Sequence, residues 1–304
     1  MLSNFSSLDE EIENLNHEDL CEITHSTLRR LLAADPLLSD LPGDVTNEEV
    51  ISQIAVLQGQ SITVFVLRNL ESPLAVVVAC TNWKRVLMVL TERANATNLM
   101  DIPASLAHAN SSLIRLSEYT TKEAQYYLNH YLSFVIVRQP FERVLSAYRN
   151  KLEDTLPSAK YFQARVGRYI VKNYRANATR RDLENGDNVT FREFAQYLIR
   201  EGIRNDVANE HWKPIYELCH PCVINYTFIG KYEQLDEDSD VILKMINAPS
   251  VLFPRSKSGQ TSERLKQYLR QLSLKDIEQL YRMYEFDFKL FGYNLESILG
   301  FDIG

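Results

Sequence analysis

The chain of 304 residues is long enough for one large domain or two small ones, and its 45% hydrophobic and 24% charged residues are typical of globular proteins. Only 10 glycines and 10 prolines are present, which excludes collagen-like and low-complexity classes, and no run of about 18 apolar residues encodes a membrane span. The net charge of −7 argues against a general nucleic-acid binder, but a local basic pocket for a small anion is compatible with it.

Residues 1–60 are acidic and polar, and we expect a weakly ordered N-terminal segment ahead of one domain at 61–304. The start has neither the basic nor the apolar region of a signal peptide. Six glycosylation sequons are nevertheless present, which fits a lumenal or secreted protein: Asn4, Asn95, Asn110, Asn177, Asn188 and Asn225. Two interpretations are open, a cytosolic protein with unused sequons or a chain without its native N-terminus.

Four cysteines are too few for a disulfide scaffold. Cys219 and Cys222 form the one close pair, with Cys21 and Cys80 distant from it in sequence. A structural zinc site needs four ligands, and no second ligand pair is evident, so a disulfide or two buried thiols is favoured over zinc. We therefore expect no metal.

Strands and helices alternate along the rest of the chain. Residues 61–68 and 74–78 are predicted strands, rich in β-branched residues, and 79–93 is a predicted helix with an amphipathic stripe. The pattern repeats with a buried strand at 131–137 and a helix at 140–154. Further elements are expected as a strand at 223–230 and amphipathic helices around 265–272 and 277–284. This alternation predicts an α/β fold with a mainly parallel sheet.

Two strand-to-helix junctions have the character of anion sites. Between Val76 and Asn82, a buried strand ends in small residues and opens a helix whose free N–H groups attract anions. The Walker A pattern is absent, and an ordinary strand–turn–helix is the alternative. At the second junction, Arg138 follows a strand and Ser146 lies on the polar face of the next helix, suited to a phosphate. Its alternative is surface ion pairing of arginines with Glu142 or Glu153.

These segments together resemble the Golgi carbohydrate sulfotransferases, which include the chondroitin, dermatan and N-acetylgalactosamine 4-O-sulfotransferases. The resemblance rests on ordered blocks over about residues 73–295. The blocks are ACTNWKRVLMVLT at 79–91, VRQPFERVLSAYRNK at 137–151, EHWKPIYELCHPCVINYTFIGKYEQL at 210–235, FPRSKS at 253–258 and YEFDFKLFGY at 284–293.

The resemblance implies a P-loop-like parallel sheet flanked by helices and an enzyme that uses 3′-phosphoadenosine 5′-phosphosulfate (PAPS). It maps the 5′-phosphosulfate loop onto Val76, Val77, Val78, Ala79, Cys80, Thr81 and Asn82. The 3′-phosphate site maps onto 138–146, where Arg138 and Ser146 are the expected contacts and Pro140, Glu142 and Arg143 lie between them. Arg255 and Lys257 are expected to close a basic loop over the nucleotide.

The loop departs from the family pattern. The family reads Pro-Lys-Val-Ala-Cys-Thr-Asn, whereas this chain has Val76 and Val77 in place of the Pro and the Lys. Loss of one donor to developing charge typically slows an enzyme by about 10²–10³-fold. Lys84 and Arg85 lie a helical turn further on, where we expect them to be poorly placed to substitute. A weak enzyme, an inactive relative and a misjoined exon are all open explanations.

Transfer to a sugar hydroxyl requires a general base, and histidine is the side chain best poised near neutral pH. His108 is the preferred candidate, because related sulfotransferases place their base histidine between the two anion segments; His211, beside Glu210, is the second. Either histidine has a structural role as its alternative. A basic wall for a partly anionic glycan is expected from among Arg149, Lys151, Arg175, Arg180 and Arg181.

The main functional hypothesis is therefore a carbohydrate O-sulfotransferase that moves the sulfuryl group of PAPS to a glycosaminoglycan-type acceptor by in-line transfer, without nucleic acid as a partner. The resemblance implies a type II membrane protein of the Golgi lumen, although the anchor helix usual in the family is not seen in this sequence. The second hypothesis is a relative that binds nucleotide or glycan without turnover, favoured by Val77. A nucleotide kinase is disfavoured by the absent loop lysine and glycines.

Overall fold

A computed structural model of the chain describes residues 64–67, 74–77, 81–109, 112–113, 118–201, 209–248, 250–255 and 261–299. The predicted N-terminal segment, 1–60, lies outside these residues. The sheet has four strands in the order β1-β2-β3-β4. Its members are β1 (Val64–Leu67), β2 (Leu74–Val77), β3 (Leu132–Val137) and β4 (Phe228–Lys231). Strands β2, β3 and β4 are parallel and β1 is antiparallel to β2, so the predicted α/β arrangement with a mainly parallel sheet is confirmed.

The connection from β2 to β3 is built from short helices. Helix α4 (Thr81–Leu90) buries Trp83, Val86 and Leu87 completely, at the spacing that the sequence predicts. It ends at Leu90, before the predicted end at 93. A 3-10 turn η1 (Leu99–Asp101), α5 (Ala104–Ala107) and α6 (Thr121–His130) follow. Helix α6 starts with a capping box between Thr120 and Glu123, which satisfies N–H groups that would otherwise lack partners.

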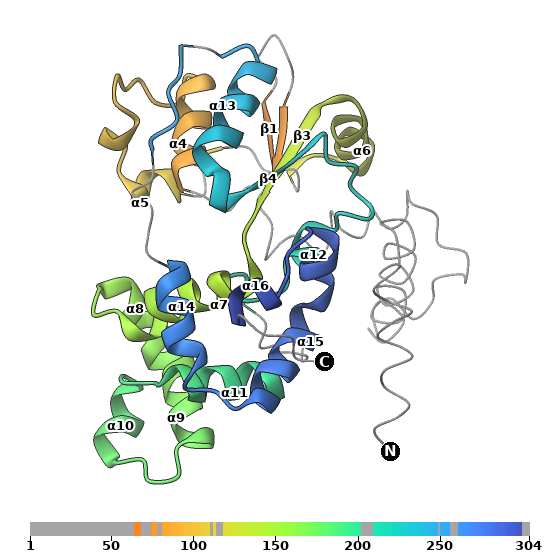
Figure 1. Cartoon of the computed structure of the whole chain (residues 1–304). Helices are drawn as coiled ribbons and strands as arrows, with labels where there is room; N and C mark the ends of the chain where they lie inside the picture. Colours follow the sequence, from red (N-terminus) through yellow and green to blue (C-terminus); the bar gives the residue numbers. More distant parts are fainter. Residues whose placement is uncertain are drawn as a thin grey trace, which may run out of the picture.

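Strand β3 is the centre of the sheet, and its side chains alternate between two apolar layers. Phe134 packs with α4 and α13 (Leu235–Met245), while Val135 and Val137 pack with α6 and α12 (Ile215–Cys219). Figure 1 shows α4 and α13 together on one side of the strands and α6 on the other. This burial on both faces explains why the strand reads as a continuous apolar run.

A helical layer is inserted between β3 and β4 (Figure 1). It comprises α7 (Pro140–Tyr148), η3 (Arg149–Glu153), α8 (Pro157–Phe162), η4 (Gln163–Gly167), α9 (Arg168–Tyr174), α10 (Arg180–Asn185) and α11 (Phe191–Glu201). The single helix predicted at 140–154 is divided, because η3 is a π-helical turn. The side-chain amide of Gln163 donates to the carbonyls of Leu152 and Asp154, 2.9 Å each, and so stabilises the end of that turn.

The C-terminal helices close this layer around an aromatic core. They are α14 (Thr261–Leu269), α15 (Leu274–Leu290) and α16 (Glu296–Leu299), so the two predicted amphipathic helices exist with wider bounds. Tyr284 and Phe288 of α15 are buried with Phe141, Phe194 and Trp212. In the part of the chain that the structure describes, no helix combines the length and apolarity needed to cross a membrane.

The predicted strand at 223–230 is shorter and shifted, because the chain turns before it. His220 adopts a left-handed conformation at the end of α12, and its carbonyl accepts from the N–H groups of Val223 and Ile224. Strand β4 therefore starts only at Phe228. A 3-10 turn, η5 (Tyr232–Gln234), then leads from β4 into α13.

The close cysteine pair is not a disulfide. Cys219 is a free, buried thiol whose pKa burial raises to about 12, whereas Cys222 is disulfide-bonded. Among the described residues, no group of three or more His, Cys, Asp or Glu side chains is arranged to hold a metal ion.

Candidate functional site

The carboxyl ends of β2 and β3 meet at one edge of the sheet. Val77 pairs with Val135 in a parallel register, and β3 continues to Val137. Helices α4 and α7 then begin at Thr81 and Pro140, directly beyond these two strand ends. In open parallel sheets, this edge is where ligands bind. The prediction that the strands ending near Val77 and Arg138 are neighbours in the sheet is confirmed, and the anion sites at their ends stay a prediction.

His108 lies against the first turn of α4. Its Nε2 is 3.0 Å from Thr81 Oγ1, and its Nδ1 is 3.3 Å from Lys84 Nζ. Thr81 and Lys84 are three residues apart, so both side chains lie on the same helix face and reach the ring together. The candidate base and the candidate phosphosulfate segment are therefore in direct contact.

Arg85 and Asn82, also in this turn, have structural contacts. The Arg85 guanidinium is buried, donates to the carbonyl of Ile102 at 2.9 Å and donates to Asn82 Oδ1 at 2.9 Å. Arg85 thus ties α4 to the segment before α5, and this tie also positions the chain leading to His108. The Arg85 guanidinium is thus engaged by Ile102 and Asn82.

Arg138 is held where β3 and β4 end. Its guanidinium pairs with Glu142 at 3.3 Å and lies 4.4 Å from the centre of the Tyr232 ring. Both side chains are largely buried, at 15% and 11% exposure. The Arg138–Glu142 ion pair that the sequence offered as an alternative therefore exists, but it does not lie on the surface. The Arg138 Nε is buried and, within the described residues, has no hydrogen-bond partner. Neighbouring Gln139 is fixed by its N–H, which donates to Glu233 at 2.8 Å.

Arg143 holds the segment that carries His211. Its two terminal nitrogens donate to the carbonyls of Lys213 and Glu210, both at 2.6 Å. The segment is also fixed from α15, because the buried Asp287 carboxylate accepts the N–H groups of Ile215 and Tyr216 at 2.7 and 2.8 Å. The role that the structure shows for Arg143 is therefore to position this segment.

The two candidate histidines face a common group of cations. Burial lowers the pKa of His211 to about 4, aided by Lys151, Arg143 and His108. The His108 ring is more exposed, but desolvation and the charges of Lys84, Lys151 and Arg85 also lower its pKa. Both rings are consequently neutral at pH 7. A neutral imidazole is the form that can accept a proton.

Lys151 belongs to this group because of the π-helical turn η3. Its ammonium lies 4.8 Å from the centre of the Phe162 ring, and the same ring contacts His211 edge-on at 5.6 Å. Desolvation lowers the pKa of Lys151, while Glu210 opposes that effect. Such single π-helical turns are frequent at functional sites.

A polar cavity of about 390 Å³ lies beside α7 and η3. It is lined by Ser146, Arg149, Asn150, Glu153, Asp154 and Thr155. Ser146, a predicted phosphate contact, thus opens into a cavity, while Arg138 is not among its lining residues. Ser146 Oγ accepts a hydrogen bond from Asn150 at 3.3 Å.

The remaining predicted residues are less well placed by the structure. Val78, Ala79, Cys80 and Lys257 lie outside the described residues, and of Val76 and Val77 only the strand backbone is described. Arg255 is exposed beyond Phe253. Three arginines proposed for a glycan wall form ion pairs within the protein: Arg149 with Glu153, Arg175 with Glu193 and Arg180 with Glu184.

The contact of Lys84 with His108 and the approach of Lys151 to both histidines were missed by sequence reasoning. The i, i+3 spacing of Thr81 and Lys84 was the available signal for the first. No local signal exists for the second, because it depends on a π-helical turn and on the segment 209–214.

The geometry defines an α/β protein in which two neighbouring parallel strands end at one edge and a neutral histidine lies beside a lysine at that edge. The profile described as "Sulfotransferase family" matches residues 78–294, so the chain belongs to the sulfotransferase family.

Several curated proteins are similar to this chain over its domain. It is 41% identical to carbohydrate sulfotransferase 11 of Rattus norvegicus over 229 aligned residues. The alignment covers 74% of this chain and 64% of that protein. This chain is 40% identical over 224 residues to carbohydrate sulfotransferase 14 of Danio rerio (72% and 58%) and 38% identical over 223 residues to carbohydrate sulfotransferase 8 of Homo sapiens (71% and 51%). The chain thus spans between 51% and 64% of these relatives. No solved structure matches it significantly.

Proposed function

We propose that this protein is a carbohydrate O-sulfotransferase that uses PAPS as sulfuryl donor and a glycan hydroxyl as acceptor. The observation that carries the proposal is the shared edge of β2 and β3, where α4 and α7 begin and His108 contacts Thr81. Family membership and the printed names of the relatives point to the same reaction class. The P-loop-like character of the 78–80 loop is part of this proposal.

The residues present fit an anionic nucleotide. The first-turn N–H groups of α4 have no carbonyl partner within the helix, and Lys84, Lys151 and Arg143 bring positive charge toward the two histidines. At the second strand end, Arg138 retains a buried donor, Nε, without a hydrogen-bond partner among the described residues. We assign the 5′-phosphosulfate side to Thr81 and Asn82 and the 3′-phosphate side to Arg138 and Ser146.

The donor, when bound, supplies the sulfuryl group and a phosphate leaving group. The protein holds charge around the transfer point and withdraws a proton from the acceptor hydroxyl. His108 is the proposed base, since it lies beside Thr81 and is neutral at pH 7. His211 is the second candidate, positioned across the cation group by the Arg143 clamp.

We further propose a partly anionic acceptor of the chondroitin type, sulfated at the 4-hydroxyl, and action in the Golgi lumen. The acceptor assignment is supported by relatives named carbohydrate sulfotransferases. The lumenal location is supported by sequons whose asparagines are exposed at every described position: Asn95, Asn177, Asn188 and Asn225.

The experiment combines nucleotide binding with transfer. Isothermal titration with 3′,5′-adenosine bisphosphate (PAP) should show saturable binding, and labelled sulfate should pass from PAPS to desulfated chondroitin. His108→Gln should abolish transfer while leaving PAP binding intact, because the base contacts the acceptor proton and not the adenosine. Absence of PAP binding by the unchanged chain would refute the proposal. Normal turnover in His108→Gln would exclude His108 as the base.

The second candidate function is nucleotide or glycan binding without turnover, and Val77 in place of the loop lysine favours it. PAP binding without any transfer is its expected result. Val77→Lys is the companion variant, because a gain of about 10²–10³-fold in turnover would identify the missing donor as the cause of impairment.

A further inference from the structure

We propose that Lys84 is a positioning residue that sets the tautomer of His108 and so links the base to an anion at the start of α4. The inference rests on the proposed function, because it takes His108 as the base, but it adds a role for Lys84 that the mechanism above does not contain. Both nitrogens of the His108 ring are engaged, one by Thr81 and one by Lys84.

The chemistry of the two partners determines which nitrogen carries the proton. A lysine ammonium has three N–H donors and no acceptor, so the contact of 3.3 Å between Lys84 Nζ and His108 Nδ1 requires a lone pair on Nδ1. A neutral ring then carries its proton on Nε2, which donates to Thr81 Oγ1 at 3.0 Å. The hydroxyl of Thr81 can accept this bond, so the arrangement is consistent throughout.

A consequence is that His108 cannot accept a proton at Nε2 while Lys84 holds Nδ1. Nε2 becomes an acceptor only after its proton is lost to water and a proton from water binds Nδ1, which leaves the ring neutral. That exchange requires the Lys84 ammonium to leave Nδ1. Because Nε2 faces Thr81 at the start of α4, we take Nε2 as the nitrogen that accepts the proton, and in the arrangement that the structure shows the base is then in the inactive tautomer.

An anion at the start of α4 provides the reason for Lys84 to move. Lys84 is in the first turn of α4 and is only half-buried, with a flexible stem that reaches toward Thr81. Pairing with an anion at the free N–H groups of this turn is stronger for an ammonium than donation to a neutral ring. The donor anion thus releases Nδ1, and His108 becomes a base when there is something to transfer.

The charges around the ring favour the same coupling. Lys84 and Arg85 of α4, Lys151 of η3 and His211 of the segment before α12 face His108. The three cations oppose protonation of His108, whereas His211 is itself neutral, so the ring is neutral at pH 7 and Lys84 determines its tautomer there.

Long-range ¹H–¹⁵N spectra of the full chain test the proposal without any turnover. In the free protein at pH 7.5, His108 should show the Nε2–H tautomer. Lys84→Met should shift the population toward Nδ1–H, whereas Lys84→Arg, which keeps a donor, should retain the pattern. Lys160→Met, which removes an exposed lysine of α8, is the matched control and should change nothing. Adding PAP together with inorganic sulfate to the unchanged chain should produce the same shift as Lys84→Met.

Activity gives a second readout. The charge of Lys84 lowers the pKa of His108, so its removal in Lys84→Met should raise that pKa. The acid limb of the pH profile of kcat/KM should then move to higher pH. If the unchanged chain binds no PAP and transfers no sulfate, the proposed function fails, while the spectra of the free protein still decide the role of Lys84. If it is active and Lys84→Met leaves both the tautomer and the pH profile unchanged, the inference is wrong.

Discussion

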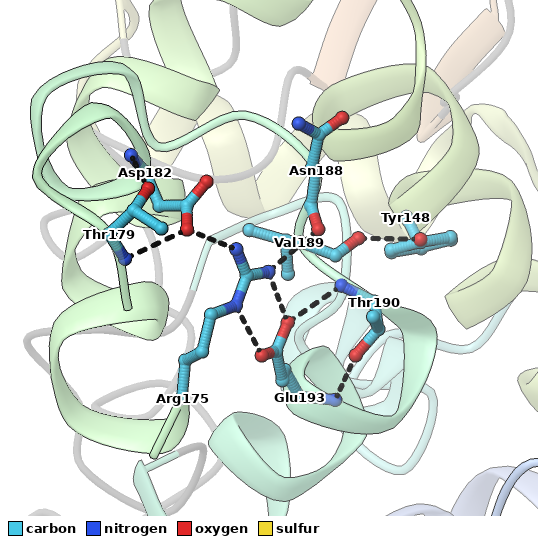
Figure 2. Close-up of polar contacts among 8 residues, drawn as sticks. All are labelled: Tyr148, Arg175, Thr179, Asp182, Asn188, Val189, Thr190 and Glu193. Carbon is cyan, nitrogen blue, oxygen red and sulfur yellow. Dashed lines mark hydrogen bonds and ion pairs between the residues drawn. The ribbon is translucent and has the colours of Figure 1, made fainter. Parts of the chain in front are cut away.

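Arg175→Met removes the centre of a network that joins α9, α10 and α11 (Figure 2). Arg175 donates to both carboxylate oxygens of Glu193 at 2.8 Å each and to the carbonyl of Asn188 at 2.7 Å, and it pairs with Asp182 at 3.6 Å. Glu193 and Asp182 also accept backbone N–H groups at the starts of α11 and α10, so one guanidinium supports two helix caps.

The cost of this substitution follows from the burial of the partners. Side-chain exposure is 18% for Arg175 and 13% for Glu193, and each hydrogen bond between charged groups contributes roughly 1.5–3 kcal/mol when partly buried. Allowing for solvent screening and for the Glu193 bonds that remain, we expect a loss of about 2–3 kcal/mol in the free energy of unfolding. In a domain of this size that corresponds to a fall of roughly 4–10 °C in Tm.

Urea unfolding followed by circular dichroism measures the loss, and Arg180→Met is the matched control. The Arg180–Glu184 contact is as short, at 2.7 Å, but its side chains are 93% and 61% exposed, so its removal should leave the midpoint unchanged. Equal urea midpoints for Arg175→Met and the unchanged chain would refute the view that this partly buried ion pair stabilises the fold more than an exposed pair does.

Two further substitutions test the helical layer. Gly186→Ala should cost about 2–5 kcal/mol in urea unfolding, because Gly186 has φ +65° and an added Cβ would lie 2.1 Å from the carbonyl oxygen of Gln163; a loss below about 1 kcal/mol would contradict this packing. Burial raises the pKa of Asp287 to about 6 from its ordinary 3.8, so the folded state holds this proton more tightly than the unfolded state. Its contribution to stability is complete below about pH 4 and is lost as the pH rises through 6, by up to about 3 kcal/mol. Asp287→Asn should flatten that part of the stability–pH curve, and an unchanged slope would exclude Asp287 as its source.

The sheet and its edge were predictable because they depend on local patterns. The apolar run of β3 and the apolar stripe of α4 each predict one element. The right-handed crossover between parallel strands then restricts how these elements are arranged. The two strand ends with their polar residues, near Val77 and Arg138, could therefore be placed together before any coordinates were known.

The details of the site were less predictable because they depend on contacts between distant segments. The pairing of Arg138 with Glu142 is local and was one of the two alternatives, but its burial beneath Tyr232 depends on the position of β4. The π-helical turn that carries Lys151 is stabilised by Gln163, from beyond the next helix. An amphipathic pattern does not contain this information, since it continues smoothly across the turn.

The positive charge near the histidines connects anion binding with base chemistry. Lys84 comes from α4, and Arg143 and Lys151 come from the continuous stretch α7–η3, so these charges lie outside the loop position that Val77 occupies. Desolvation and these cations lower the pKa of His108 and of His211, so both rings are neutral at pH 7. An anion that binds among them offsets part of their charge and raises the proton affinity of the nearby ring. The same groups that would hold the donor therefore make a base that is unprotonated before binding and a better proton acceptor afterwards.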